Sequence, residues 1–329
     1  MKNSLNSLFR ITISLGLLGL LLYLLREDIP RIAKTLRDVD PLTLGLAVLI
    51  LLSTVVIMAK RLQLIFRADG VHLSLMQGTN LTLIGYFFNN FLPTAVGGDI
   101  VKAMAASRLT GQTVKSITFV LMDRLFGLFT FVLIPSLSFL FLLKQKQNPL
   151  LPILIYAFLV LSLFCCVLIF NKNIARRFRF IESLLRLVKL AEKAKLIYNG
   201  LNSFRHHKGT ITQVLFLSVL GQSIGIVVLY MMALALGAKP SLVYFFLMVP
   251  IVQLLSMLPS LGGLGIREGA FIGLLAPHIG REYAVALSIL WLFQLVILSA
   301  MGGLIYLTQG AYHVQFPFNS SHSKRTGKA

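Results

Sequence analysis

Six long apolar runs, separated by short polar segments, dominate the pattern of hydrophobic and polar positions along the 329-residue chain. They lie at about 8–25, 42–58, 118–143, 149–170, 210–236 and 282–310. A helix needs roughly 20 mostly apolar residues to cross a bilayer, so each run predicts a transmembrane helix. Composition agrees, because 57% of the residues are hydrophobic and only 13% are charged. The sequence therefore predicts an all-α integral membrane protein with about six full spans.

The basic residues are distributed unevenly, and their distribution predicts the topology. Lysine and arginine are enriched before the first run, in the segment 59–74 and in the tail 311–329, whereas the basic and acidic residues of 26–41 are balanced. Cytoplasmic loops carry an excess of basic residues. We therefore expect both termini in the cytoplasm and the segments 26–41 and 237–241 outside, in a bacterial cytoplasmic (inner) membrane.

The segment 171–209 is the richest in basic residues and predicts a cytoplasmic amphipathic helix. Its apolar residues recur at spacings of three and four: Ile174, Phe178, Ile181, Leu185 and Val188. A basic helix with one apolar stripe lies in the headgroup plane of a membrane. The net charge of +20 is interpreted as topogenic, with lysine and arginine kept on the cytoplasmic side near anionic headgroups, and not as a sign of nucleic-acid binding. The segment either recognises anionic phospholipid, the expected partner, or is a solvated surface helix that only sets the topology.

The parity of the spans leaves two apolar segments that must return to the side from which they start. These are 75–108 in the first membrane half (1–170) and 242–279 in the second (210–310), so we expect two re-entrant helical hairpins approached from opposite faces. The two segments also resemble each other. Each reads leucine, proline and a hydroxyl residue, then a glycine pair and an isoleucine, and the prolines, Pro93 and Pro259, stand 166 residues apart. Interrupted apolar segments at matching positions are typical of inverted repeats that meet at a binding site, although two unrelated helix breaks would be the alternative.

The chemistry concentrates at these breaks, where a helix that restarts after glycines presents free N–H groups to an anion. The candidate lipid- or ligand-binding residues are the glycines and charged residues there and at the start of the third run: Gly97, Gly98, Asp99, Lys102, Asp123, Arg124, Gly262, Gly263, Gly265, Arg267 and Glu268. Charges inside membrane proteins usually pair or contact a ligand. The alternative is that these charges only neutralise each other and fasten the hairpins together. The sequence carries no recognisable catalytic motif, so we expect no catalytic residue, no metal and no cofactor.

Three motifs together resemble a known family. They are Asn89-Asn90-Phe91-Leu92-Pro93 running into Gly97-Gly98-Asp99, then Asp123-Arg124 with Gly127, and Pro259 with Gly262-Gly263-Leu264-Gly265 and Arg267-Glu268-Gly269. The combination resembles the transmembrane region of lysylphosphatidylglycerol synthase, a flippase-like family, over about residues 10–310. One departure is Lys102, where relatives usually have arginine, and the lysine lacks the bidentate fork that arginine offers to phosphate.

The resemblance implies a flippase-like protein that moves a phospholipid or a related polar-headed lipid between leaflets. The soluble aminoacyl-transfer domain of the two-part synthases is expected to be absent, so lysyl transfer is not carried over, and a separate lipid-modifying enzyme would be a partner. Two alternatives stay open. One is a membrane enzyme acting on a lipid phosphate or lipid-linked sugar, with Asp99, Asp123 or Glu268 as acid or base. The other is an ion-coupled small-solute transporter in which Asp99 or Glu268 titrates.

Overall fold

Helices form every regular element in the part of the chain that the computed structural model describes. This part comprises residues 26, 28–92, 96–141, 204–258 and 265–313, with isolated positions within 153–164 and 198–202. Four helices are long and apolar enough to cross a membrane: α3 (Pro41–Ala68), α6 (Thr113–Phe141), α11 (Lys208–Ala235) and α14 (Arg281–Thr308). The all-α prediction is confirmed, and these helices coincide with four of the six predicted spans.

The remaining predicted elements fall partly outside the described residues. The run at 8–25, most of the run at 149–170 and most of the basic segment 171–209 lie there, so the count of six spans and the cytoplasmic amphipathic helix stay predictions. The other described elements are shorter: α2 (Ile29–Arg37), α4 (Leu75–Phe91), α5 (Gly97–Thr110), α12 (Leu242–Leu255), α13 (Ile266–Ile279) and the 3-10 helices η1 (Phe204–His206) and η2 (Gly310–Tyr312).

Two sets of four helices repeat the same order and nearly the same lengths. Helices α3, α4, α5 and α6 have 28, 17, 14 and 29 residues, and α11, α12, α13 and α14 have 28, 14, 14 and 28. Their packing corresponds as well, because α4 contacts α14 as α12 contacts α6, and α5 contacts α6 as α13 contacts α14. The repeat that the sequence pattern indicates at Pro93 and Pro259 thus extends over four helices in each half.

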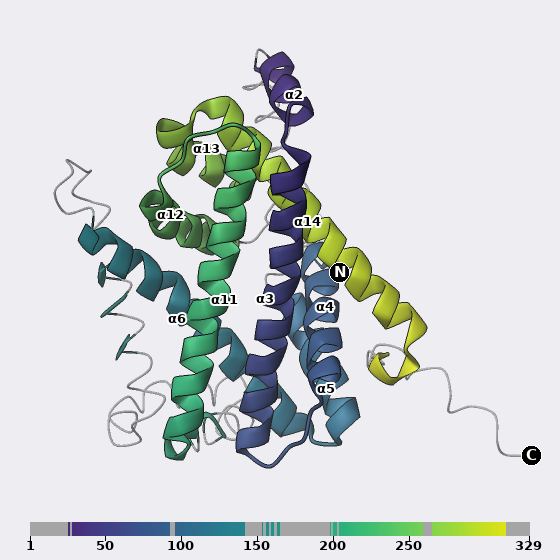
Figure 1. Cartoon of the computed structure of the whole chain (residues 1–329). Helices are drawn as coiled ribbons and strands as arrows, with labels where there is room; N and C mark the ends of the chain where they lie inside the picture. The colour runs from purple at the N-terminus through teal and green to yellow at the C-terminus, as the bar shows by residue number, and fades with distance from the viewer. Residues whose placement is uncertain are drawn as a thin grey trace, which may run out of the picture.

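The equivalent helices α3 and α11 pack side by side and run in opposite directions (Figure 1). The N–H of Asp40, just before α3, donates to the carbonyl of Ala235 at the end of α11 (2.8 Å). Farther along α3, Arg61 contacts Ser218, in the first half of α11. Antiparallel equivalents are what an inverted-topology repeat requires.

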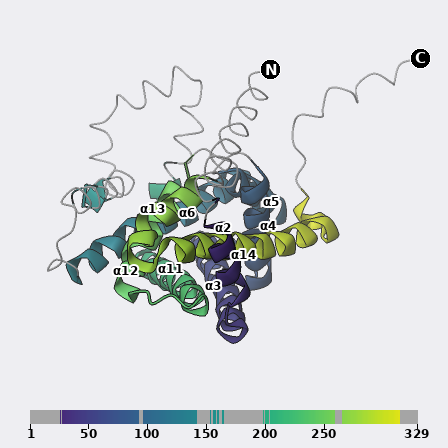
Figure 2. The ribbon, with the colours of Figure 1, turned by 90° about the horizontal axis from the view of Figure 1, so that it is seen from above.

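The broken helix pairs α4–α5 and α12–α13 lie on opposite sides of α3 and α11 and open at opposite ends of the bundle (Figures 1 and 2). An ion pair between Lys115 and Asp69 (2.7 Å) brings the beginning of α6 to the segment before α4, at one end. An ion pair between Arg281 and Asp28 (3.4 Å) holds the beginning of α14 at the other end. The pairs have the geometry expected of hairpins entering from opposite faces, and their re-entrance within a bilayer stays a prediction.

Local sequence signals explain where these helices begin. The Asp40 carboxylate accepts hydrogen bonds from the N–H groups of Leu42 (3.2 Å) and Thr43 (3.1 Å), and Pro41 occupies the first turn of α3. Ser74 and Gln77 form a capping box at the beginning of α4. Both arrangements satisfy N–H groups that the first helical turn leaves unpaired.

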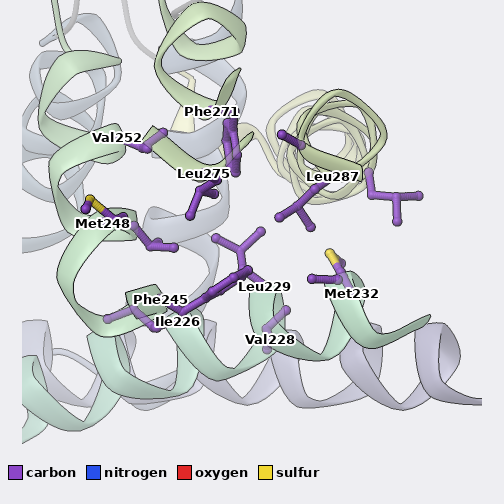
Figure 3. Close-up of a cluster of buried hydrophobic side chains, with 14 of the residues drawn as sticks. Ile226, Val228, Leu229, Met232, Phe245, Met248, Val252, Phe271, Leu275 and Leu287 are labelled. Carbon is purple, nitrogen blue, oxygen red and sulfur yellow. The ribbon is translucent and has the colours of Figure 1, made fainter. Parts of the chain in front are cut away.

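An apolar core packs the second half together. Leu229 of α11, Phe245 of α12, Phe271 of α13 and Leu287 of α14 are fully buried and belong to one cluster (Figure 3). This core holds α12 and α13 against the two long helices of their half, and so fixes where the break between them lies.

Glycine allows the backbones of α4, α5 and α14 to approach closely. A Cβ at Gly302 of α14 would lie 2.0 Å from the carbonyl oxygen of Leu83 in α4. A Cβ at Gly98 of α5 would lie 2.1 Å from the carbonyl oxygen of Gly85 in α4. Small residues at helix interfaces serve this role in membrane proteins. The broken pair α4–α5 is therefore wedged tightly against α14.

The positions of the ends of α3 and α11 lead to a prediction about the membrane topology. Cysteines replacing the exposed Lys34 and Lys239 should react with an impermeant reagent added outside intact cells, in a background lacking Cys165 and Cys166. Cysteines at Arg67 and Lys208 should react only after permeabilisation, because these residues lie at the opposite end of α3 and α11. Labelling of Lys34→Cys and Arg67→Cys from the same side would contradict the topology.

Candidate functional site

A cavity of about 340 Å³ lies where the two halves meet, and all eight helices of the two sets contribute to its wall. Its charged lining residues are Arg61, Asp99, Lys102, Asp123, Arg124 and Arg267. Its amide-bearing lining residues are Asn89, Asn90, Gln222, Gln253 and Gln294. A cavity between apolar helices with charged and amide side chains in its wall is a candidate ligand site.

The carboxylate of Asp123 binds two cations at once. Its Oδ1 accepts a hydrogen bond from Nε of Arg61 (2.7 Å), and its Oδ2 accepts one from Nζ of Lys102 (2.9 Å). All three residues are buried. Nη1 of Arg61 also donates to Oγ of Ser218 (3.2 Å). One carboxylate therefore joins α6 to α3 and α5, and through Arg61 to α11.

A second ion pair lies one residue farther along α6. Nη1 of Arg124 is 3.1 Å from Oδ2 of Asp99 in α5, and Nη2 of Arg124 contacts the sulfur of Met257 (3.6 Å). The two groups attract each other without a well-aligned hydrogen bond. Oδ2 of Asp99 is buried and accepts no hydrogen bond from any residue in the described ranges. Arg124 thus spans from the first half to the segment that follows α12.

The beginning of α13 is organised by Glu268. Gly265 has a φ of +83°, a conformation that glycine adopts without strain, and its N–H donates to Oε2 of Glu268 (2.6 Å). Both Nε (3.0 Å) and Nη2 of Arg267 donate to Oε1 of the same carboxylate. Arg267 is 2% exposed and reaches the cavity wall, so the second half contributes a buried cation of its own.

The structure gathers five of the predicted site residues at the cavity wall. Asp99, Lys102, Asp123, Arg124 and Arg267 line the cavity, and Glu268 pairs with Arg267. Gly97, Gly98 and Gly265 are not among the lining residues. Gly262 and Gly263 lie outside the described residues.

The glycines serve the helix ends in a way that the sequence did not indicate. The N–H of Gly98 donates to Oδ1 of Asn89 (2.9 Å), and Gly98 is required for the close approach of α5 to α4. The N–H of Gly265 is bound by Glu268. In both cases a side chain of the protein accepts the hydrogen bond from an N–H group that the sequence pattern predicted to bind an anion. The charged side chains are therefore the stronger candidates for binding an anionic ligand.

One hypothesis from the sequence is that the charged residues fasten the two hairpins to each other, and the described ion pairs are arranged differently. The ion pairs found within the described ranges connect α5 and α6 to each other and to α3, and Arg267 pairs with its own neighbour. None of them joins the pair α4–α5 to the pair α12–α13. The ion pairs hold the first half together, and Arg61 and Arg124 reach the second half through Ser218 and Met257, which are uncharged.

Arg61 and the three glutamines of the cavity wall, Gln222, Gln253 and Gln294, are the site residues that the sequence analysis did not identify. The sequence analysis placed Arg61 in a cytoplasmic loop, because it expected the second span to end at residue 58. In the structure α3 continues to Ala68. Thr54, Met58 and Arg61 all line the cavity and recur at spacings of four and three. That helical stripe was the available signal, since it places Arg61 on the same face as residues inside the span.

The amide groups form a second polar region, mostly from the second half. Nε2 of Gln222 donates to Oε1 of Gln253, which joins α11 to α12. Nδ2 of Asn90 donates to the carbonyl of Leu295 (3.2 Å) and to Oγ of Ser299, which joins α4 to α14. Gln294 is only 7% exposed, and its Oε1 has no hydrogen-bond donor in the described part of the chain. Buried acceptors of this kind are uncommon and need a partner.

The charges of the site do not cancel. Arg61, Lys102, Arg124 and Arg267 provide four cations, and Asp99, Asp123 and Glu268 provide three carboxylates, so the described site carries a formal charge of +1. An uncompensated charge in a low-dielectric interior is costly. The site is therefore suited to an anionic ligand group.

The double ion pair predicts a large stability effect at Asp123. Asp123→Asn leaves Arg61 and Lys102 buried without a carboxylate, and breaking a buried pair in this way typically costs about 3–5 kcal/mol. Thermal unfolding in detergent should show a markedly lower midpoint. The matched control is Asp69→Asn, which breaks the exposed pair with Lys115 and should change stability by less than about 1 kcal/mol. Equal midpoints for the two variants would contradict the assignment.

Comparisons with known proteins agree with the resemblance in the motifs. The family described as the lysylphosphatidylglycerol synthase TM region matches residues 7–302. A UPF0104 membrane protein of Methanothermobacter thermautotrophicus is 28% identical over 256 residues, which are 68% of this chain and 71% of the relative. A UPF0104 membrane protein of Pyrococcus horikoshii is 25% identical over 325 residues, 90% of this chain and 95% of the relative. The chain is a membrane protein that belongs to the lysylphosphatidylglycerol synthase transmembrane-region family.

Proposed function

We propose that the chain binds a phospholipid or a related polar-headed lipid by its anionic headgroup in the cavity and translocates the lipid between leaflets. The observation that carries this proposal is a cavity of net positive charge, formed by every helix of two oppositely oriented halves. Transporters built from inverted repeats bind their substrates at such an interface and expose the site to each side in turn. The proposed setting is a cytoplasmic membrane, with a separate lipid-modifying enzyme as the source of the lipid.

The two alternative functions fit the geometry less well. A general acid or base must be able to exchange a proton with the substrate. Asp123 is held by two cations, Asp99 lies against Arg124, and Glu268 binds Arg267 and the N–H of Gly265. Each of these carboxylates is already paired with a cation of the protein. This favours a binding role for the cations over proton transfer by the carboxylates, in an enzyme or in an ion-coupled transporter alike.

A substitution of Lys102 best separates an effect on lipid binding from an effect on folding. Because Asp123 keeps its bond to Arg61, Lys102→Gln removes a cation without leaving a carboxylate unpaired, and it lowers the formal charge of the site from +1 to zero. The variant should stay folded, with a smaller stability loss than Asp123→Asn. A hydrogen bond to a charged group contributes about 1.5–3 kcal/mol, so binding of anionic lipid should fall roughly tenfold or more.

The measurement combines native mass spectrometry of co-purified lipid with translocation of fluorescent anionic lipid in reconstituted vesicles. Lys102→Arg keeps the charge and adds a bidentate fork, so it should retain both properties. Lys115→Gln is the matched control, because Lys115 lies on α6 outside the cavity in an exposed pair. If folded Lys102→Gln protein binds and moves anionic lipid at the wild-type rate, the proposed function is wrong.

A further inference from the structure

We infer that the broken pair α12–α13 is the part of the protein that moves, pivoting at Gly237 and Gly280, and that the pair α4–α5 belongs to a fixed scaffold. The inference rests on the proposed function for the need to open the cavity to each side in turn, and it does not depend on what the cavity binds. Three features differ between the halves and carry it: the ion pairs, the close backbone contacts and the links at the ends of each pair.

Both broken pairs have hinge-like connections at their ends. Gly70 and Gly111, at the ends of α4–α5, have φ values of +76° and +69°. Gly237 and Gly280, at the ends of α12–α13, have φ values of +85° and +95°. Glycine adopts these angles without strain, and hinges are usually a few residues at the ends of helices. The backbone therefore allows either pair to pivot, and the contacts of each pair decide which one does.

Ion pairs hold α5 in place. Lys102 of α5 pairs with Asp123 of α6 (2.9 Å), and Asp123 also pairs with Arg61 of α3 (2.7 Å). Asp99 of α5 lies 3.1 Å from Arg124 of α6, measured between the charged atoms. A movement of α5 away from α6 would leave the buried Lys102 without its counter-ion, which is costly. The first pair is therefore locked to the long helices of its own half.

The second pair carries its charges within itself. Arg267 of α13 pairs with the neighbouring Glu268, so the two charges travel together when α13 moves. No ion pair within the described ranges joins α12 or α13 to another helix. In the sequence, Lys239, Arg267 and Glu268 are the only lysine, arginine or acidic residues within 209–280. The pair packs on α11 and α14 through the apolar core of Figure 3, and packed helices of this kind can slide without separating charges.

Close backbone contacts hold α4 but not α13. Gly98 and Gly302 bring the backbones of α5 and α14 so near to α4 that a Cβ at either glycine would overlap with it. Helices interlocked in this way must separate before they can slide past each other. In α13, a Cβ at Gly269 or Gly273 would meet no atom of the described chain within 4 Å. Helix α13 therefore has room to shift that α4 lacks.

The ends of the first pair are tied to other parts of the protein. Lys115 of α6 pairs with Asp69 (2.7 Å), which links the connection that leaves α4–α5 to the one that enters it. Nδ2 of Asn80 in α4 donates to Oε1 of Gln309 and to Oη of Tyr312 (both 3.1 Å), in the segment that follows α14. These links restrict rotation of α4–α5 about its two end glycines.

At the ends of the second pair the described contacts join different elements. The ion pair between Arg281 and Asp28 (3.4 Å) ties the beginning of α14 to the segment before α2, and not to the segment that enters α12. The rings of Tyr244 in α12 and His278 in α13 stack with their centroids 3.9 Å apart. The second pair is thus held together internally, and we expect it to move as one unit.

Distances between spin labels, measured by pulsed electron paramagnetic resonance in nanodiscs of phosphatidylglycerol and phosphatidylcholine, test the inference. In a background without the native cysteines, Leu255→Cys in α12 with Phe216→Cys in α11 reports on the second pair. Ile100→Cys in α5 with Leu49→Cys in α3 reports on the first pair. All four side chains are exposed, and none is among the residues that line the cavity.

We expect the second label pair to give a distance distribution at least about twice as wide as the first, because a two-state element populates both of its positions. Hydrogen exchange of the unmodified protein provides an independent measurement. Amides of α12 and α13 should exchange at least about tenfold faster than those of α4 and α5, since exchange follows local opening.

A variant tests whether the ion pairs are the cause of the difference. Lys102→Gln removes one lock on α5, so it should widen the distribution between labels at residues 100 and 49 and speed exchange in α5, with α13 unchanged. Lys208→Gln, at an exposed position at the beginning of α11, is the matched control and should change neither quantity.

The outcomes separate this inference from the proposed function. Two narrow distributions, or a first distribution as wide as the second, overturn the inference, and so does exchange in α12 and α13 that is no faster than in α4 and α5. If lipid is still translocated in either case, the proposed function survives. Motion of α12–α13 as expected, in protein that moves no lipid between leaflets, supports the inference and counts against the proposed function.

Discussion

The carboxylate of Asp123, shared between Arg61 and Lys102 inside an apolar bundle, is the interaction on which the rest of the site depends. Three charged groups that would each be costly to bury alone are buried together, because each finds its counter-ion within 3 Å. The arrangement fixes three helices of the first half and, through Arg61 and Ser218, the first helix of the second half. It also leaves the cations facing the cavity, held in place by the protein and only partly neutralised.

The break in each helix pair brings that charge to the centre. A continuous helix through residues 75–110 would carry Asp99 and Lys102 away from α6, whereas the break after Phe91 turns the chain back so that α5 packs on α6. Close contacts at Gly98 and Gly302 then seat α4 between α5 and α14. In the second half the corresponding break lets α13 present Arg267 from the other side. The two helix breaks therefore determine both the packing of the helices and the position of the charged residues at the cavity.

Much of this architecture could be predicted from the sequence. Apolar length gave four of the long helices, and the Pro/Gly breaks marked both broken pairs, because these signals are local and strong. The ends of the helices were less predictable: α3 continues ten residues beyond the expected end of the span. The sequence does not show whether a basic residue near the end of a helix faces the cytoplasm or a buried counter-ion. For Arg61 the counter-ion is Asp123, which is 62 residues away in the chain and comes into contact only in the fold.

The ion-pair partners of the charged residues could not be predicted without the fold. Asp99 and Lys102 lie three residues apart on α5, yet Asp99 contacts Arg124 and Lys102 contacts Asp123. The amides escaped sequence reasoning for a related reason, since Gln222, Gln253 and Gln294 belong to three helices and form no motif in the chain. Inverted packing is what brings them together with the cations.

The central claim is that this cavity holds an anionic lipid headgroup, and a structure of the protein in nanodiscs containing phosphatidylglycerol tests it most directly. The account predicts density for a phosphate group within hydrogen-bond distance of at least one of Lys102, Arg124 and Arg267. A cavity that contains only water, or only an acyl chain, at a resolution that shows these side chains would contradict it.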